Sequence, residues 1–252
     1  MLKKRIIPVQ LLNQGRLVKT TGFGTWRDVG DPVASSRVYN SQYADELVFL
    51  NIQRDQRSTE SLLKLIEKVS EVCFMPLSMG GGIRSLSDAE SLIRHGADKV
   101  VLNSICFSDS SLITKVADKF GSQAVVVSLD LRKEKEDYCL YSDCGRKKES
   151  ASLEEHIDNI IAKGAGELFV NSIDRDGTMQ GYDTALIQKV MKLSRIPVIA
   201  CGGAGSFEHM KEAFLATDVS ALACGSLFNF GDNNPIRAKA FLSNHGLQFK
   251  KV

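Results

Sequence analysis

Long apolar runs and an excess of charge of one sign are both missing from this sequence. No run approaches the roughly 20 residues that a membrane-spanning helix needs. The basic N-terminal stretch has only a very short apolar part and lacks the small-residue cleavage site of a secretion signal. The 32 Lys and Arg residues are balanced by 30 Asp and Glu residues, which argues against nucleic acid or a membrane surface as a partner. We therefore expect a cytoplasmic protein.

Metal-binding and disulfide patterns are also missing. No two of the six cysteines form a CxxC pair, and no histidine stands at zinc-finger spacing from them. We expect free thiols in a reducing compartment, with no metal and no cofactor.

The sequence does contain a regular alternation of short apolar runs and amphipathic segments. Its 252 residues, 43% of them apolar, are enough for a large core and exclude disordered, collagen-like and coiled-coil chains. Eight β-branched runs are predicted to be strands buried on both faces, and most are separated by segments of helical spacing. The runs are residues 6–9, 47–50, 75–78, 100–102, 124–127, 168–170, 196–200 and 219–223. This alternation predicts a parallel sheet.

An internal repeat organises these units. Residues 76–107 align without gaps to residues 197–228, so the offset is 197 − 76, or 121. Two halves of four strand–helix units predict one (β/α)8 TIM barrel over residues 1–252, with half-barrels at about 1–122 and 123–252. An open doubly wound sheet is the alternative fold, but it gives no reason for a twofold repeat.

Glycine-rich strand ends recur at equivalent places in the two halves. Gly80-Gly81-Gly82 and Gly202-Gly203 end the third and seventh strands, while Asn103-Ser104 and Gly225-Ser226 follow the fourth and eighth. Glycines at these places let backbone N–H groups approach an anion, although tight turns use the same residues. We predict one phosphate site in each half and an elongated substrate with a phosphate at each end.

Carboxylates at strand ends are the candidates for proton transfer. Asp130 closes the fifth strand. Asp176, followed by Gly177, comes after the sixth strand and is either a site residue or an ordinary turn residue. The four histidines fall on predicted helices or the tail, and no strand ends in the lysine of a Schiff-base enzyme. Lys19 begins a long segment, residues 19–32, that either closes over a ligand or is a plain surface loop.

Two acids and two bases stand at the opposite, amino-terminal ends of the strands. They are Arg5, Glu46, Lys99 and Glu167. They either form modest surface ion pairs or converge on the bottom entrance of the barrel.

Taken together, these residues resemble the HisF family, the cyclase subunit of imidazole glycerol phosphate synthase, over nearly the whole chain. Among the matching stretches are Arg27-Asp28-Val29-Gly30-Asp31-Pro32, Gly80-Gly81-Gly82-Ile83-Arg84-Ser85 and Asp174-Arg175-Asp176-Gly177-Thr178. The resemblance implies a half-barrel-duplicated fold of the ribulose-phosphate-binding type.

The resemblance also implies a partner and roles for individual residues. A HisH-like glutaminase subunit would dock on the amino-terminal face, as a heterodimer, and supply ammonia through the barrel. Arg5, Glu46, Lys99 and Glu167 would form the gate of this path, Asp130 would be catalytic, and Lys19 would be important for activity. The substrate would be a bisphosphorylated aminoimidazole carboxamide ribonucleotide. Its expected binding residues are Gly81, Gly82, Asn103, Ser104, Asp176, Gly177, Gly202, Gly203, Gly225 and Ser226.

Two positions depart from the family pattern. Leu11 stands where the family has its other catalytic aspartate, and Asn51 stands where it usually has aspartate, so we expect a mouth with less negative charge. This pattern is similar to that of HisF-like paralogues that accompany a HisH-like glutaminase and a sugar amidotransferase in acetamidino-sugar (lipopolysaccharide) biosynthesis.

We expect such a paralogue, because a leucine cannot transfer a proton. The alternatives are a genuine histidine-pathway cyclase, which forms imidazole glycerol phosphate and aminoimidazole carboxamide ribonucleotide, and a conduit or scaffold without chemistry of its own. An isomerase is disfavoured, because that class also relies on a strand-1 aspartate.

Overall fold

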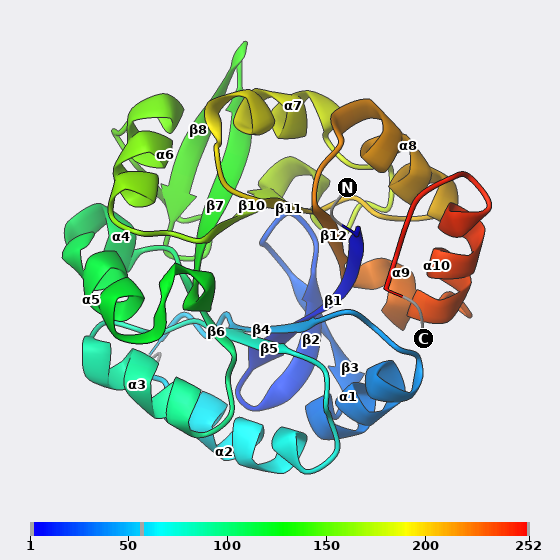
Figure 1. Cartoon of the computed structure of the whole chain (residues 1–252), viewed down its shortest axis with the longest axis horizontal. Coiled ribbons are helices and arrows are strands. Elements are labelled where there is room, and N and C mark those ends of the chain that lie inside the picture. The colour runs from blue at the N-terminus through cyan, green and yellow to red at the C-terminus, as the bar shows by residue number, and fades with distance from the viewer. Residues whose placement is uncertain (1–2, 56–57, 251–252) are drawn as a thin grey trace.

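Parallel strands close into a barrel in the computed structural model, which describes residues 3–55 and 58–250 (Figure 1). Within these ranges the ring runs β1-β4-β5-β6-β7-β10-β11-β12, and β12 pairs with β1 to close it. The strands are β1 (Arg5–Asn13), β4 (Leu47–Asn51), β5 (Leu77–Gly80), β6 (Lys99–Leu102), β7 (Val125–Glu134), β10 (Glu167–Ser172), β11 (Val198–Cys201) and β12 (Ala221–Cys224). Each overlaps one of the predicted apolar runs, so the (β/α)8 prediction is confirmed.

Helices surround the barrel on its outside (Figure 1). They are α1 (Pro32–Ser41), α2 (Glu60–Ser70), α3 (Leu86–Arg94), α4 (Ile105–Ser108), α5 (Ser111–Phe120), α6 (Leu153–Ala162), α7 (Thr184–Leu193), α8 (Phe207–Thr217), α9 (Ser226–Asn229) and α10 (Pro235–Ser243), with 3-10 turns η1 (Ser122–Ala124) and η2 (Ile173–Arg175). Apolar residues three or four apart bury one face of each long helix, as Leu62, Ile66 and Val69 do in α2. In the described part of the chain no helix is both long and apolar enough to cross a membrane.

Two antiparallel hairpins extend the sheet beyond the barrel. β1 continues into a pairing with β2 (Arg16–Thr20), which pairs with β3 (Trp26–Gly30), and β7 pairs with β8 (Asp137–Ser142), which pairs with β9 (Lys147–Lys148). The turn between β1 and β2 has positive φ at both Gln14 (50°) and Gly15 (74°), the geometry of a type I′ hairpin turn. β2, β3 and the turn between them form a second hairpin over residues 16–30, which includes most of the segment 19–32 that we predicted either to close over a ligand or to be a plain surface loop.

Successive residues of each barrel strand face alternately the helices and the lumen. The helix-facing set joins the helices in one large apolar core. The lumen-facing set forms a second apolar cluster, which consists of Ile7, Val9, Val48, Val101, Val126, Phe169, Ile199, Ala221 and Ala223. The middle of the barrel is thus apolar, and the polar side chains that bear on function lie at its two ends.

Candidate functional site

A cavity of about 1240 Å³ opens at the carboxyl ends of the barrel strands. Every residue predicted to act on or bind a substrate lines it, from both halves of the chain. These residues are Lys19, Gly81, Gly82, Asn103, Ser104, Asp130, Asp176, Gly177, Gly202, Gly203, Gly225 and Ser226, together with Leu11. Residues up to 215 positions apart in sequence are thereby brought to one site, which we call the mouth cavity.

The glycines after β5 and β11 have matching backbone conformations. Gly81 and Gly202 both have φ of +99°, and Gly82 and Gly203 have φ of +86° and +101°. A Cβ at position 203 would also collide with the carbonyl oxygen of Gly181. Only glycine suits such positions without strain, so the two halves present the same backbone path at two places on the rim.

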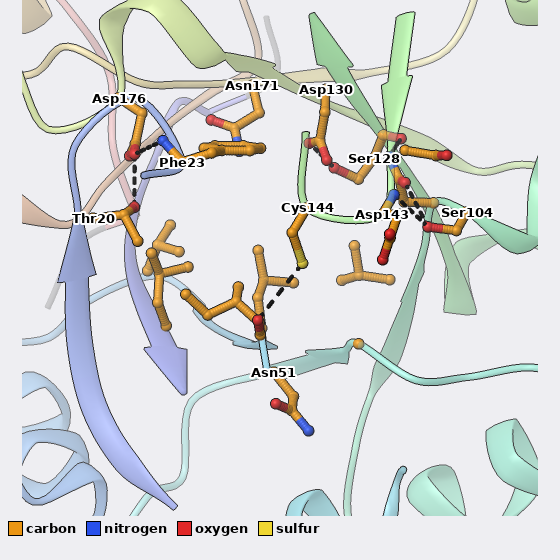
Figure 2. Close-up of a pocket in the computed structure, with 18 of the residues that line it drawn as sticks. Thr20, Phe23, Asn51, Ser104, Ser128, Asp130, Asp143, Cys144, Asn171 and Asp176 are labelled. Atoms are coloured by element: carbon orange, nitrogen blue, oxygen red, sulfur yellow. Dashed lines mark hydrogen bonds between the residues drawn. The ribbon is translucent and has the colours of Figure 1, made fainter. Parts of the chain in front are cut away.

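Asp130 lies in the mouth cavity at the end of the lumen-facing series of β7. The Ser128 hydroxyl donates to Asp130 Oδ1 at 3.1 Å, and the Asn103 amide donates to the Ser128 carbonyl at 2.9 Å (Figure 2). Because Asp130 is only 9% exposed, these neighbours fix where its carboxylate can point. A buried, oriented carboxylate of this kind can accept or deliver a proton.

Lys19 reaches into the mouth cavity from β2. Its ammonium donates to the Val9 carbonyl, and a Cβ at Gly225 would collide with Lys19 Nζ. Burial lowers the pKa of Lys19 to about 8, while Cys201 and Asp176 oppose that shift. The ammonium therefore lies between β1 and the residue that follows β12, beside one of the glycines predicted to hold the second phosphate.

Asp176 holds the turn between β2 and β3. Its Oδ2 accepts hydrogen bonds from the Thr20 hydroxyl at 2.6 Å and from the Phe23 N–H at 3.1 Å (Figure 2). Arg54 holds the other side of this turn by donating to the Phe23 carbonyl at 2.7 Å. The segment 19–32 is thus held at the mouth cavity by hydrogen bonds, and Asp176 uses one of its carboxylate oxygens in them.

The two departures from the family pattern have different surroundings. Leu11 lines the mouth cavity and packs on the lumen cluster, so an apolar side chain occupies that place. Asn51 instead points away from the other labelled residues, and its amide donates to the Ser58 carbonyl and the Ser61 hydroxyl (Figure 2). Asn51 also lines the mouth cavity, but its amide is directed to the start of α2, and the expectation that it lowers the negative charge of the mouth stays a prediction.

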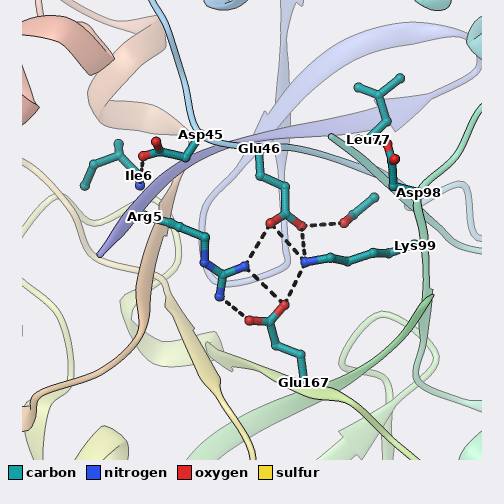
Figure 3. A network of polar contacts seen from close by, with 9 residues as sticks. Arg5, Ile6, Asp45, Glu46, Leu77, Asp98, Lys99 and Glu167 are labelled. Atoms are coloured by element: carbon teal, nitrogen blue, oxygen red, sulfur yellow. Dashed lines mark hydrogen bonds and ion pairs between the residues drawn. The ribbon is translucent and has the colours of Figure 1, made fainter. Parts of the chain in front are cut away.

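The four predicted gate residues contact one another at the amino-terminal end of the barrel (Figure 3). Arg5 donates to Glu46 at 2.9 Å and to both oxygens of Glu167. Lys99 Nζ lies 2.9 and 3.0 Å from the two oxygens of Glu46 and 2.9 Å from Glu167. We call this closed ring of two acids and two bases the entrance network.

Burial and charge act against each other in the entrance network. Burial disfavours the charged form of Glu167, but hydrogen bonds and attraction from Arg5 and Lys99 outweigh burial and hold the pKa of Glu167 below its usual range. Burial likewise opposes the charge of Arg5, yet Glu167 and Glu46 raise its pKa. Arg5 and Glu167 are thus held in their charged forms by the entrance network, and loss of any one of the four side chains leaves its partners with an uncompensated cost of burial.

Sequence reasoning missed three polar residues that face the lumen. Ser78 of β5 donates to Glu46 at 2.7 Å and extends the entrance network, while Ser128 and Asn171 line the mouth cavity. The sequence does contain a signal for Asn171, because residues two apart on a strand share one face. Glu167, Phe169 and Asn171 therefore lie on the same face of β10. In the part of the chain that the structure covers, no group of three metal-ligating side chains is present and no disulfide joins the cysteines.

The chain is similar to a group of named proteins along its whole length. The model of the family described as "Histidine biosynthesis protein" matches residues 5–234. Proteins named "Imidazole glycerol phosphate synthase subunit HisF" are 41% identical in Pelodictyon phaeoclathratiforme and 42% identical in a Thermotoga species, covering 98–99% of this chain and 98% of each relative. The protein of the same name from Streptococcus mutans is 40% identical over 99% of this chain and 100% of its own length.

Proposed function

The chain belongs to the HisF family, and we propose that it takes up ammonia at the amino-terminal end of its barrel and uses it at the mouth cavity. One observation carries this proposal: two polar ends are joined by an apolar lumen. The entrance network stands at one end and Asp130 at the other, with side chains such as Val48 and Phe169 between them. An apolar passage suits neutral ammonia, because an ion would lose its hydration there.

The ammonia would come from a HisH-like glutaminase subunit docked on the amino-terminal face as a heterodimer. Two aromatic side chains on this face support the docking, since Tyr43 is 53% exposed and Phe74 is 84% exposed. Both lie on loops that lead into strands at this end of the barrel, β4 and β5. Aromatic side chains are enriched in protein interfaces, so their exposure fits a surface that a partner covers.

The reaction we propose is that of the imidazole glycerol phosphate synthase cyclase. In it, a bisphosphorylated aminoimidazole carboxamide ribonucleotide and ammonia give imidazole glycerol phosphate, aminoimidazole carboxamide ribonucleotide and water. The names of the relatives support this histidine-pathway activity better than the acetamidino-sugar pathway that we expected from the sequence. The matching backbone at Gly81 and Gly202 supports a substrate with two phosphates, and Asp130 is proposed to transfer the proton.

Leu11 is the observation that favours a second candidate function. With an apolar side chain at that place, Asp130 is the one carboxylate left of the two that the family uses, and a positioned acid or base is worth about 100- to 10,000-fold in rate. A subunit that delivers ammonia for acetamidino-sugar synthesis, with a sugar amidotransferase as a further partner, would keep the entrance network and the phosphate sites without that carboxylate.

Turnover of the aminoimidazole substrate with ammonium salt tests the proposal directly. We expect product from the purified chain, and we expect Leu11→Asp to raise the rate by about 100-fold or more. Leu50→Asp is the matched control, because Leu50 is the register partner of Leu11 on β4 and also packs on the lumen cluster. Absence of product from both the natural chain and Leu11→Asp at high enzyme concentration would rule out the cyclase.

The remaining alternative is an ammonia conduit without chemistry of its own. Asp130→Asn separates it from an enzyme, because a conduit needs no proton transfer at the mouth. If the reaction coupled to the glutaminase continues at the natural rate in Asp130→Asn, the chain is a conduit. If turnover is lost while glutamine hydrolysis continues, the chain carries out the reaction itself.

A further inference from the structure

We propose that the side-chain carbonyl of Asn171 binds ammonia as it leaves the apolar lumen, an inference that rests on the function proposed above. Asn171 lies on β10, is 7% exposed and lines the mouth cavity. Its Oδ1 is buried and has no hydrogen-bond partner within the described residues. Leaving a buried carbonyl oxygen unpaired is costly, so this atom is suited to a ligand that donates a hydrogen bond.

The position of Asn171 on β10 places it on the path from the entrance. Glu167, Phe169 and Asn171 follow one another on the lumen-facing side of the strand. Glu167 belongs to the entrance network and Phe169, fully buried, to the apolar lumen cluster. Four residues of strand span about 13 Å. A molecule that passes Glu167 and crosses the apolar layer along this strand therefore meets the carbonyl of Asn171 where that layer ends.

The chemistry of an amide carbonyl fits ammonia in particular. Ammonia can donate one N–H to Oδ1 and keep its lone pair free to attack a substrate. A neutral amide oxygen stabilises the ammonium ion less than a carboxylate would, so it favours protonation of the bound ammonia less. Asp130 is the register partner of Asn171 on β7, and Figure 2 shows Asn171 between Asp130 and Asp176 on the cavity wall. Ammonia held at Asn171 would thus lie beside the proposed proton-transfer group.

Gln10 provides a matched control within the same chain. Both of its side-chain polar atoms are buried with no hydrogen-bond partner among the residues that the structure describes, and the residue is fully buried on β1. Its neighbours Val9 and Leu11 face the lumen, so Gln10 faces the helices and does not line the mouth cavity. Asn171→Leu and Gln10→Leu each remove a buried amide, but only the first removes one from the proposed ammonia path.

The binding test follows the side-chain amide resonances of the 15N-labelled chain while ammonia is added at a pH where much of it is unprotonated. The Asn171 resonances are identified by their loss in Asn171→Leu, and those of Gln10 by their loss in Gln10→Leu. We expect the Asn171 signals to shift and saturate while the Gln10 signals stay in place. Asn171 signals that do not move, or that move only in parallel with those of Gln10, would overturn the proposal.

A kinetic test separates this proposal from the proposed function. In Asn171→Leu we expect the KM for ammonia to rise about five- to tenfold, the value of one hydrogen bond. With glutamine as the source of ammonia, Asn171→Leu should also release more glutamate for each molecule of product formed. Gln10→Leu should change neither quantity, and an unchanged KM in Asn171→Leu contradicts the proposal. If neither the natural chain nor Leu11→Asp makes product, the cyclase proposal fails, and the resonance titration still decides whether Asn171 binds ammonia.

Discussion

Removal of Lys99 from the entrance network is predicted to affect stability and ammonia transfer together. Its ammonium contacts both Glu46 and Glu167, whose side chains are 3% and 9% exposed. Lys99→Met leaves two buried carboxylates with Arg5 as their shared cation. Breaking a buried ion pair from one side costs about 3–5 kcal/mol. The 18% exposure of Lys99 lowers our expectation to about 2–4 kcal/mol, or a Tm decrease of roughly 5–15 °C for a chain of this size.

The pH dependence of this loss follows from Glu167. Its folded-state pKa lies below the usual range, because Arg5 and Lys99 outweigh the effect of burial. The stabilisation is therefore complete above the unfolded-state pKa of about 4.3 and is lost as pH falls through the folded-state pKa. The difference in unfolding free energy between the natural chain and Lys99→Met should be largest near pH 7 and should shrink below about pH 4. Urea unfolding at several pH values measures it.

Lys239→Met is the control for the transfer part of this prediction. Lys239 of α10 pairs with Asp45 at 2.6 Å, with side-chain exposures of 10% and 6%, on the helix side of the barrel wall. Lys239→Met should lose a similar amount of unfolding free energy and keep the natural ratio of glutamine-dependent to ammonia-dependent turnover. Lys99→Met should lower that ratio. A loss of unfolding free energy under about 0.5 kcal/mol in Lys99→Met, or equal turnover ratios in the two variants, would contradict this prediction.

Three further changes test other parts of the site. Asp130→Asn should lower turnover about 100- to 10,000-fold in steady-state assays while glutamine hydrolysis by the partner continues. Lys19→Met should raise the unfolding free energy at pH 7, by at most about 3 kcal/mol in urea titrations, because burial lowers the pKa of Lys19 to about 8. Since the unfolded chain binds more protons between pH 8 and about 10.4, the natural chain should gain stability over that range and Lys19→Met should not. Gly203→Ala should weaken inorganic phosphate binding in calorimetry, because its Cβ would meet the Gly181 carbonyl oxygen; unchanged binding would contradict a phosphate site there.

Sequence reasoning predicts the barrel well because its signals are local. Short β-branched runs predict the barrel strands. The 121-residue offset predicts that the two halves have similar backbone structures, as the equal φ of Gly81 and Gly202 illustrates. The half-barrel boundaries stay a prediction. The hairpin after β1 was missed because Gln14-Gly15 is a weaker turn signal than Asn-Gly, although both residues adopt the required positive φ.

Side-chain direction is the part of the site that composition and spacing leave open. Asn51 lines the mouth cavity, yet its amide is directed away to Ser58 and Ser61 at the start of α2. Asp176 was predicted to bind substrate, and the structure adds its hold on Thr20 and the β2–β3 turn. These contacts depend on where separate loops meet in space, which no local pattern encodes.

We propose that ammonia travels through the barrel lumen from a glutaminase to the mouth cavity. The most direct test gives the complex glutamine labelled with 15N in its amide, the aminoimidazole substrate, and an excess of unlabelled ammonium in solution. We expect product whose new nitrogen is mostly 15N, because labelled ammonia would reach Asp130 without mixing with the solution. Product with the isotope ratio of the bulk ammonium would contradict it.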